Sequence, residues 1–357
     1  MRDGRTVPAE FDRWAERNWT GDNYAAAFEV WLHATGHAAD PIHAWAITVP
    51  GRASGQVPLV WIGTRAAGRN AKGLRPEARL STIGGMVSEW EVRFRSLDGT
   101  SLVGTVTAVP EVPAVGAVVL VHGAGVTREE GGFFARMAVG LAAAGARVLR
   151  FDLRAHGASG GRAEDITIAG VANDIRAASD HLRQVVGFDG PLHVVAASFS
   201  GGAAALHAAY RPREVDHLVL LNPRLDYRDR YVDSRPYFDG DYITTTGARD
   251  LDERGFTEKS PFELGRALHN EVFYLDPDVY LRAVQAPVLL VHGTKDTFVP
   301  VESSRRYLPV FSGPAELVEL DGAQHGFAVH DDPQYADPQS QAWQAEVIER
   351  VTGFLSV

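Results

Sequence analysis

The sequence has no cysteine among its 357 residues and carries no excess of positive charge. Without cysteine there can be no disulfide, no thiolate nucleophile and no zinc site with cysteine ligands. The formal net charge of -10 disfavours nucleic acids and anionic membranes as partners, because both favour proteins with clustered lysine and arginine. We therefore expect the partner to be a small neutral or organic substrate.

Long hydrophobic runs are also absent. No segment approaches the ~18 consecutive apolar residues that a membrane span requires, and residues 1–10 lack the apolar stretch of a secretory signal. His33 and His37 have the spacing of helical metal ligands but no paired carboxylate, and no Gly-Lys-Ser or Gly-Lys-Thr phosphate loop occurs. We expect a cytoplasmic protein that uses neither a metal nor an organic cofactor.

A regular pattern of strands and helices begins near Glu91. The alternating runs Glu91–Ser96 and Leu102–Ala108 flank Asp98-Gly99 and predict a β-hairpin. Short apolar runs predict buried strands at 117–121, 148–151, 192–196, 218–221, 288–291 and 317–320. Segments with helical periodicity lie between most of these strands or after the last, at 133–144, 171–186, 202–210 and 341–355. This alternation predicts an α/β fold with a doubly wound, mostly parallel sheet, whose active site lies at the carboxyl ends of the strands.

Two segments interrupt this pattern and divide the chain. Residues 222–285 contain many aromatic residues but no strand-like run, and we interpret them either as a cap over the strand ends or as a surface excursion with its own small core. The core then comprises residues 86–221 and 286–357. Residues 1–85 are an N-terminal extension with two open interpretations: a helical arm that packs on the cap or on a second subunit of a homodimer, or an extended reading frame without a catalytic role.

A serine lies at a strand-to-helix turn in the middle of the core. The predicted strand 192–196 leads into Ser198 and then into the helix 202–210. Acyl-transfer hydrolases place their nucleophile at such a turn, where only small residues fit two positions before and after it, here Ala196 and Ser200. The literal Gly-x-Ser-x-Gly motif is absent, and a second alignment makes Ser200 the nucleophile. On this pattern alone both serines stay candidates, beside a purely structural role.

A serine nucleophile needs a neighbouring base and a carboxylate that orients the base. Asp296 follows the predicted strand 288–291, and His325 follows the last predicted strand. Both residues therefore lie at carboxyl ends of strands, as Ser198 does. Asp226 is an alternative acid on an earlier loop, whereas His330 lies beyond the loop that carries His325.

These segments resemble the α/β-hydrolase family of serine hydrolases from about Glu89 to Val357. In that family a proline, a valine and the next strand follow the nucleophile at recurring distances, which Pro212, Val215 and 218–221 match when Ser198 is the nucleophile. The resemblance thus implies a triad in the family's chain order, formed by Ser198, Asp296 and His325.

The resemblance also implies an oxyanion hole and an activity. The loop after the strand 117–121 would supply the Ala124 N–H, and Phe199, next to the nucleophile, would supply a second N–H. The layout, with a cap between the sixth and seventh strands, is similar to that of feruloyl and cinnamoyl esterases. It implies a carboxylesterase-like enzyme that forms an acyl-serine intermediate on a small-molecule acyl substrate.

The aromatic residues of the insertion suggest the kind of acyl group. Tyrosine combines apolar area with a polar tip, so we expect an aromatic or bulky acyl group to contact Tyr227, Tyr231, Tyr237 and Tyr242. The alternative is that these rings pack among themselves or face solvent. Acyl transfer, cyclisation, thioester hydrolysis and peptide hydrolysis would use the same triad, and a binding module that has lost catalysis is a further alternative.

Overall fold

The computed structural model describes residues 87–110, 113–330, 332 and 335–356, together with the short strands at 45–47 and 60–62. The chain divides into two compact units, Met1–Glu77 and Ala78–Val357. In the first unit β1 (Trp45–Ile47) pairs in antiparallel fashion with β2 (Val60–Ile62). The expectations for residues 1–85, including the homodimer contact and the exclusion of His33 and His37 as ligands, otherwise lie outside the described residues.

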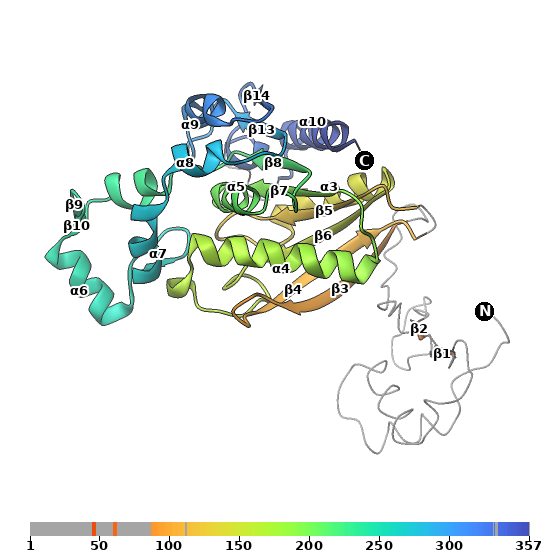
Figure 1. Ribbon diagram of the computed structural model, residues 1–357, viewed down its shortest axis with the longest axis horizontal. Coiled ribbons are helices and arrows are strands. Elements are labelled where there is room, and N and C mark those ends of the chain that lie inside the picture. Colours follow the sequence, from red (N-terminus) through yellow and green to blue (C-terminus); the bar gives the residue numbers. More distant parts are fainter. Residues whose placement is uncertain are drawn as a thin grey trace, which may run out of the picture. The chain divides into compact units, whose positions relative to one another are not determined.

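An eight-stranded sheet forms the centre of the second unit, in the order β14-β13-β8-β7-β5-β6-β4-β3 (Figure 1). The antiparallel pairs are β3–β4 and β4–β6, and the remaining neighbours are parallel. The predicted hairpin turns at Gly99, whose φ of 87° suits a residue without a Cβ. The doubly wound, mostly parallel sheet is confirmed. Its strands are β3 (Ser88–Arg95), β4 (Ser101–Ala108), β5 (Gly116–Val121), β6 (Ala146–Asp152), β7 (Leu192–Ala197), β8 (His217–Leu221), β13 (Val288–Gly293) and β14 (Ala315–Leu320).

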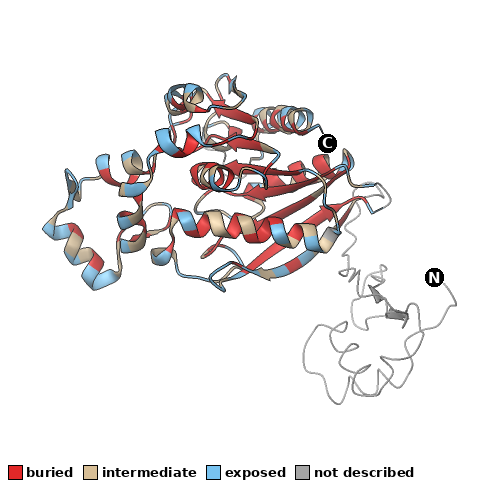
Figure 2. Cartoon of the chain, viewed as in Figure 1, coloured by how far each residue is buried: buried red, intermediate tan, exposed pale blue. Residues whose placement is uncertain are grey.

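Helices cover both faces of this sheet. On one face α3 (Phe133–Ala143) and α10 (Pro338–Leu355) pack against alternate strand residues, such as Val118 and Leu120 of β5. On the other face α4 (Ile168–Val186) and α5 (Ser200–Tyr210) pack against the other set of alternating strand residues. The strands are therefore buried on both sides (Figure 2), which explains why they read as continuous apolar runs in the sequence.

The helix ends follow from local chemistry. The hydroxyl of Thr167 accepts a hydrogen bond from Gly170 N at 2.9 Å and so caps the first turn of α4. The helix ends at Gly187, which has a left-handed φ of 61°. The short helix α9 (Val301–Tyr307), between β13 and β14, was not predicted, because two turns without an apolar stripe give too little periodicity.

The insertion occupies the chain between Leu221, where β8 ends, and Val288, where β13 begins. Its helix α8 packs against α5 and α9, while the ribbon β9–β10 and α6 lie at the end of the insertion that is far from the sheet (Figure 1). The two short ribbons were not predicted, since no apolar run marks them. The elements are β9 (Phe238–Asp239), β10 (Tyr242–Ile243), α6 (Thr245–Arg254), β11 (Phe256–Lys259), β12 (Glu263–Gly265), α7 (Arg266–Glu271) and α8 (Pro277–Arg282).

The insertion is joined to the core at the start of α4. The carboxylate of Glu271, at the end of α7, accepts hydrogen bonds from Ile168 N and from Ala169 N, the latter at 2.7 Å. These two amides belong to the first turn of α4 and have no partner within the helix, so the carboxylate satisfies them. Beside this contact, a Cβ built on Gly265 would lie only 2.0 Å from the carbonyl oxygen of Glu164. A larger residue at this position would push the insertion away from the core.

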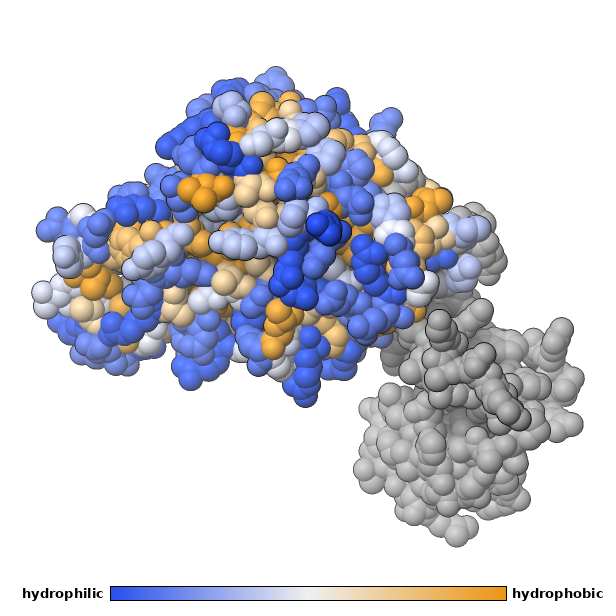
Figure 3. All heavy atoms as spheres, in the orientation of Figure 1, coloured by the Kyte–Doolittle hydropathy of each residue, from blue (hydrophilic) through white to orange (hydrophobic). Residues whose placement is uncertain are grey.

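The surface shown in Figure 3 carries hydrophobic residues scattered among hydrophilic ones. Scattered apolar residues are usual on the surface of a globular protein. None of the helices that the structure describes is long and apolar enough to cross a membrane.

Candidate active site

The turn between β7 and α5 holds Ser198 in an unusual backbone conformation. Its φ is 51°, a left-handed value that is uncommon for a residue with a side chain. Ser198 N donates a hydrogen bond to Leu221 O at 2.8 Å, and Ser198 O accepts one from Arg224 N at 2.8 Å. The neighbouring glycine is required, because a Cβ on Gly201 would lie 2.6 Å from Pro223 Cβ. The turn is thus fixed by packing, and the serine stands at the carboxyl end of its strand.

Ser198, His325 and Asp296 form a continuous hydrogen-bonded chain. Ser198 Oγ lies 2.9 Å from His325 Nε2, and His325 Nδ1 lies 2.6 Å from Asp296 Oδ2. The three residues come from the ends of β7, β13 and β14, which the parallel register brings to one edge of the sheet. In this arrangement the imidazole can accept the hydroxyl proton while the carboxylate holds its Nδ1–H.

The carboxylate of Asp296 is held ready for this role. Its second oxygen, Oδ1, accepts hydrogen bonds from Phe298 N at 2.8 Å and Val299 N at 2.9 Å, and His292 Nε2 lies 3.4 Å from Oδ2. Burial by itself would raise the pKa of Asp296, but hydrogen bonds from His292, His325 and Val299 N outweigh it and hold the pKa below its usual range. The acid therefore stays ionised at neutral pH.

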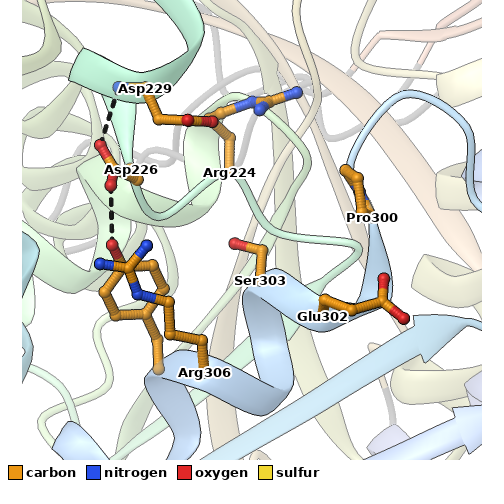
Figure 4. Close-up of a pocket in the computed structure, with 8 residues that line it drawn as sticks. Arg224, Asp226, Asp229, Pro300, Glu302, Ser303 and Arg306 are labelled. Atoms are coloured by element: carbon orange, nitrogen blue, oxygen red, sulfur yellow. Dashed lines mark hydrogen bonds between the residues drawn. The ribbon is translucent and has the colours of Figure 1, made fainter. Parts of the chain in front are cut away.

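The rival candidates have other partners. Ser200 is fully buried and donates its hydroxyl to His122 O at 2.6 Å, which joins the nucleophile turn to the loop after β5. Asp226 accepts a hydrogen bond from the Tyr307 hydroxyl at 2.7 Å and another from Asp229 N at 3.0 Å, in a neighbouring cleft (Figure 4). The structure thus brings Ser198 and Asp296, rather than Ser200 or Asp226, to His325.

The loop after β5 is held beside the nucleophile by buried polar groups. Burial lowers the pKa of His122 to about 3, so its ring is neutral; Nδ1 donates to Gly123 O at 2.6 Å and Nε2 accepts from Leu153 N at 2.9 Å. Gly123 N donates to Glu130 Oε2 at 2.9 Å. A Cβ on Gly123 would lie only 3.1 Å from Ser198 Cβ, so the loop approaches the nucleophile closely. Ala124, the next residue, is thereby placed beside it.

The triad opens into a cleft of about 340 Å³ between the strand ends and the insertion. Both residues predicted for the oxyanion hole, Ala124 and Phe199, line it together with Ser198 and His325. The full lining is Ala124, Ser198, Phe199, Arg224, Arg230, Tyr231, Ser260, Pro261, Thr297, Phe298, Val299 and His325.

Comparison with known sequences places this arrangement in a family. The profile of the alpha/beta hydrolase family matches residues 118–337, which include the nucleophile turn, the insertion, the acid and the histidine. The chain belongs to this family. It is also 28% identical over 243 residues to a monoacylglycerol lipase of Mycolicibacterium smegmatis, a match that covers 60% of this chain and 82% of the lipase.

Solved structures support the fold of this α/β-hydrolase. Est1E of Butyrivibrio proteoclasticus, solved with ferulic acid bound, superimposes with a TM-score of 0.60 at 20% identity, over 73% of this chain and 99% of Est1E. An esterase of Pyrococcus furiosus superimposes with a TM-score of 0.51 at 20% identity, over 75% of this chain and 92% of the esterase. At these identities the likeness concerns the fold.

The four tyrosines predicted to bind substrate lie in different places in this α/β-hydrolase. Tyr231 lines the cleft, stacked at a centroid distance of 6.4 Å on Tyr227. Tyr227 is buried behind the nucleophile turn and donates its hydroxyl to Phe199 O at 2.6 Å. Tyr237 packs against His269 within the insertion, and Tyr242 is 81% exposed on β10. Of the four tyrosines, only Tyr231 is thus among the residues that line the cleft.

Among the residues at the site to which sequence reasoning gave no role are Glu130, Arg224, Arg230 and Phe298. Arg224 lies three residues after the end of β8, at the same sheet edge as the triad, and this position was a usable signal. The other three lie in segments without periodicity. No group of three histidine, aspartate or glutamate side chains in the described part of the chain is arranged to hold a metal ion.

Proposed function

We propose that the protein hydrolyses carboxylic esters through an acyl intermediate on Ser198. The observation that carries this proposal is the chain of hydrogen bonds from Ser198 Oγ through His325 to Asp296 at the floor of an open cleft. The protein is a hydrolase that acts on ester bonds, and its membership of the family and its similarity to a monoacylglycerol lipase support this general activity.

The reaction would proceed in two halves. Ser198 Oγ attacks the ester carbonyl carbon as His325 Nε2 takes its proton, and His325 then returns that proton to the leaving alcohol. The N–H groups of Ala124 and Phe199 are the proposed donors to the negative oxygen that forms on the carbonyl. Water, deprotonated by the same imidazole, then attacks the acyl carbonyl carbon; the bond to Ser198 Oγ breaks, and His325 returns the proton to Oγ as the acid leaves. Asp296 accepts the Nδ1–H throughout and so keeps the proton on the correct nitrogen.

The preferred acyl group is proposed to be aromatic or bulky. The rings of Phe199, Tyr231 and Phe298 line the cleft, and Phe298, which is 72% exposed, lies 5.3 Å from the His325 ring between their centroids. Such rings give apolar contact area to a planar group. The cleft is near the lower end of the ~300–1,000 Å³ typical of ligand pockets, which favours small esters. Est1E, with ferulic acid bound, shows that a fold of this kind accommodates an aromatic acid.

A covalent probe and a chromogenic ester test the proposal. The protein should react with a fluorophosphonate probe and should hydrolyse p-nitrophenyl butyrate or p-nitrophenyl benzoate. Ser198→Ala should abolish both, since it removes the nucleophile, while Ser200→Ala should still be labelled because Ser200 is bonded to the main chain rather than to His325. Labelling that survives in Ser198→Ala but is lost in Ser200→Ala would refute the assignment.

A further inference from the structure

The charged side chains that line the catalytic cleft are of one sign. Apart from the catalytic His325, they are Arg224 and Arg230, and neither aspartate nor glutamate is among the lining residues. This contrasts with the chain as a whole, whose formal net charge is -10. A positive cleft in an acidic protein is a feature that a neutral ester would not use.

The two arginines also differ from comparable arginines of the insertion. Arg228 and Arg235 are likewise half-buried, and each has a carboxylate partner: Arg228 lies 3.3 Å from Asp233, and Arg235 lies 3.0 Å from Glu258. Neither cleft arginine forms an ion pair with any described residue. Arg224 donates to Phe298 O at 2.6 Å. Arg230 lies over the Tyr231 ring, 5.6 Å from its centroid, and makes a single long hydrogen bond of 3.4 Å to Ser260 Oγ. Most of their donors are therefore left for another acceptor.

Arg224 is held rigidly beside the nucleophile. Its main-chain N–H donates to Ser198 O at 2.8 Å, its main-chain carbonyl accepts from Gly202 N at 3.0 Å, and its guanidinium is tied to Phe298. A side chain fixed in this way loses little further freedom when a ligand binds, so the binding energy is not spent on ordering it.

The electrostatic cost of this arrangement would be relieved by an anion. Burial lowers the pKa of Arg224, and Arg230 acts in the same direction, because two positive charges approach each other across the cleft. The nearby carboxylates of Asp229 and Asp296 raise the pKa of Arg224 and so offset only part of this cost. Neither forms an ion pair with Arg224: Asp296 is bound to His325, and Asp229 only directs its carboxylate toward Arg224 (Figure 4). A guanidinium in partly desolvated surroundings binds carboxylates well, through paired hydrogen bonds.

The neighbouring cleft, which also contains Arg224, has a different charge balance. This second cleft, of about 220 Å³, shares Arg224 but contains the carboxylates of Asp226, Asp229 and Glu302, and the guanidinium of Arg306 lies across it from that of Arg224 (Figure 4). There the lining contains three carboxylates beside the two arginines, so the positive charges are balanced by the lining itself. The unbalanced charge faces the triad.

We propose that the natural substrate is an anionic ester, and that Arg224 and Arg230 bind a carboxylate group of the substrate while Ser198 attacks its ester bond. This inference rests on the proposed ester hydrolysis and specifies its substrate class. The carboxylate belongs either to the acyl part or to the leaving alcohol, and these two sources share the same chemistry at the arginines.

Matched ester pairs test the proposal in two arms. The acyl arm compares mono-p-nitrophenyl glutarate with p-nitrophenyl pentanoate, and the alcohol arm compares 4-acetoxybenzoate with phenyl acetate. In one arm the anionic ester should have a kcat/KM about 10-fold or more above its neutral counterpart, since charge-assisted hydrogen bonds are the strong ones. The preference should decrease at high ionic strength. Equal rates for both pairs would overturn the proposal.

Arginine variants locate the effect. Arg224→Gln and Arg230→Gln should each reduce the ratio of kcat/KM between the anionic and the neutral ester about 10-fold, and Arg224→Lys should retain part of this preference. Arg228→Gln is the matched control, because this half-buried arginine of the insertion lies outside the cleft, and it should leave the ratio unchanged. If the preference for the anionic ester fell equally in all three glutamine variants, the assignment of carboxylate binding to the two cleft arginines would be overturned.

A binding measurement separates this inference from the proposed activity. Calorimetric titration of the full-length Ser198→Ala protein with monomethyl glutarate and with methyl pentanoate requires no turnover. The anionic ester should bind about 10-fold more tightly, and Arg224→Gln should remove the difference. Hydrolysis of neutral esters without any preference would refute the anionic substrate alone, whereas binding of the anion by a protein that hydrolyses no ester and reacts with no fluorophosphonate would refute the proposed function alone.

Discussion

The two walls of the catalytic cleft are built in different ways. The sheet wall comprises Ala124, Ser198, Phe199, Thr297, Phe298, Val299 and His325, all on loops that directly follow parallel strands. The insertion wall comprises Arg224, Arg230, Tyr231, Ser260 and Pro261, which lie between β8 and β13. Buried hydrogen bonds of His122, Glu130 and Asp296 fix the sheet wall. Contacts such as those of Glu271 and Gly265 with the core hold the insertion.

This difference separates the chemistry from the choice of substrate. The catalytic groups on the sheet wall, Ser198, His325 and the main-chain N–H groups of Ala124 and Phe199, act on the ester bond itself, so a change there should alter the rate for every ester. Groups on the insertion wall touch the variable parts of a substrate, so a change there should alter the ratio of rates between esters. The predictions below test this division, from the largest expected effect to the smallest.

The largest effect is expected at Asp296, the acid that orients His325 of the sheet wall. Asp296→Asn keeps the side-chain volume but replaces the charged acceptor of the His325 Nδ1–H, 2.6 Å away, so the imidazole can adopt the wrong tautomer. We expect kcat to decrease by about 10³–10⁴-fold, equally for acetyl and aryl esters. Steady-state kinetics on both esters checks this. Asp226→Asn is the control, and a larger loss there would make Asp226 the working acid.

A smaller effect is expected behind the nucleophile turn. Tyr227→Phe removes a hydroxyl that donates to Phe199 O at 2.6 Å and accepts from Ala203 N at 2.9 Å, and it leaves both groups buried without that partner. The free energy of unfolding should decrease by about 1–3 kcal/mol, as measured by urea denaturation. Both esters should lose kcat by the same factor, because Tyr227 positions Phe199 and does not touch the substrate.

The matched control for this variant is Tyr231→Phe. Tyr231 stacks on Tyr227, but its hydroxyl has no hydrogen-bond partner among the described residues. Removing that hydroxyl should therefore leave stability nearly unchanged. If Tyr227→Phe changed the ratio between aryl and acetyl esters instead, Tyr227 would belong functionally to the insertion wall.

The sequence predicts the sheet wall better than the insertion wall, because only the sheet wall is marked by a local pattern. Ser198, Asp296 and His325 follow short apolar runs, and parallel strands bring their carboxyl ends to one edge, so local pattern was enough to group them. Tyr227 and Tyr231 are four residues apart in an insertion without periodicity. Both are buried, but only Tyr231 lines the cleft, whereas the hydroxyl of Tyr227 is bonded to the nucleophile turn and to α5. Only tertiary packing distinguishes them, and no local signal reports it.

The charge of the cleft is a second example. The net charge of -10 favoured a neutral partner, but a total says nothing about where the charges lie. Arg228 and Arg230 are two residues apart and look alike in the sequence. Ion pairs with Asp233 and Asp241 use the charge of Arg228, whereas Arg230 faces the cleft without such a partner among the described residues. The local excess of positive charge became visible only in the structure.

A pH-dependent effect on stability is expected at Glu130, whose carboxylate supports the sheet wall by accepting the Gly123 N–H. Burial raises the pKa of Glu130 from 4.5 to about 6, although the hydrogen bond from Gly123 N and the nearby His325 oppose the rise. Below pH 4.5 the carboxyl is protonated in both states. Between 4.5 and 6 the unfolded chain releases the proton that the folded protein retains, so stability decreases as the pH rises, and the full cost remains above 6.

Glu130→Gln should remove this cost and still accept the Gly123 N–H. The free energy of unfolding should increase by on the order of 2 kcal/mol at pH 8, with the gain vanishing near pH 4. Urea denaturation at both pH values measures it, with the exposed Glu253→Gln as control. An equal gain at both pH values would show that the buried charge is not the cause.

The smallest effect is expected at the far end of the insertion. Tyr242 is 81% exposed on β10, far from the sheet (Figure 1), so Tyr242→Ala should change stability by less than about 0.5 kcal/mol and leave the ratio of kcat/KM between aryl and acetyl esters unchanged. Tyr231→Ala is the matched comparison, since it deletes a ring that lines the cleft, and it should reduce the same ratio several-fold. If Tyr242→Ala altered the ratio as much as Tyr231→Ala, the ribbon β9–β10 would have to close over the cleft when substrate binds. The insertion wall would then extend to that ribbon, and the separation of the two walls would hold only for the empty enzyme.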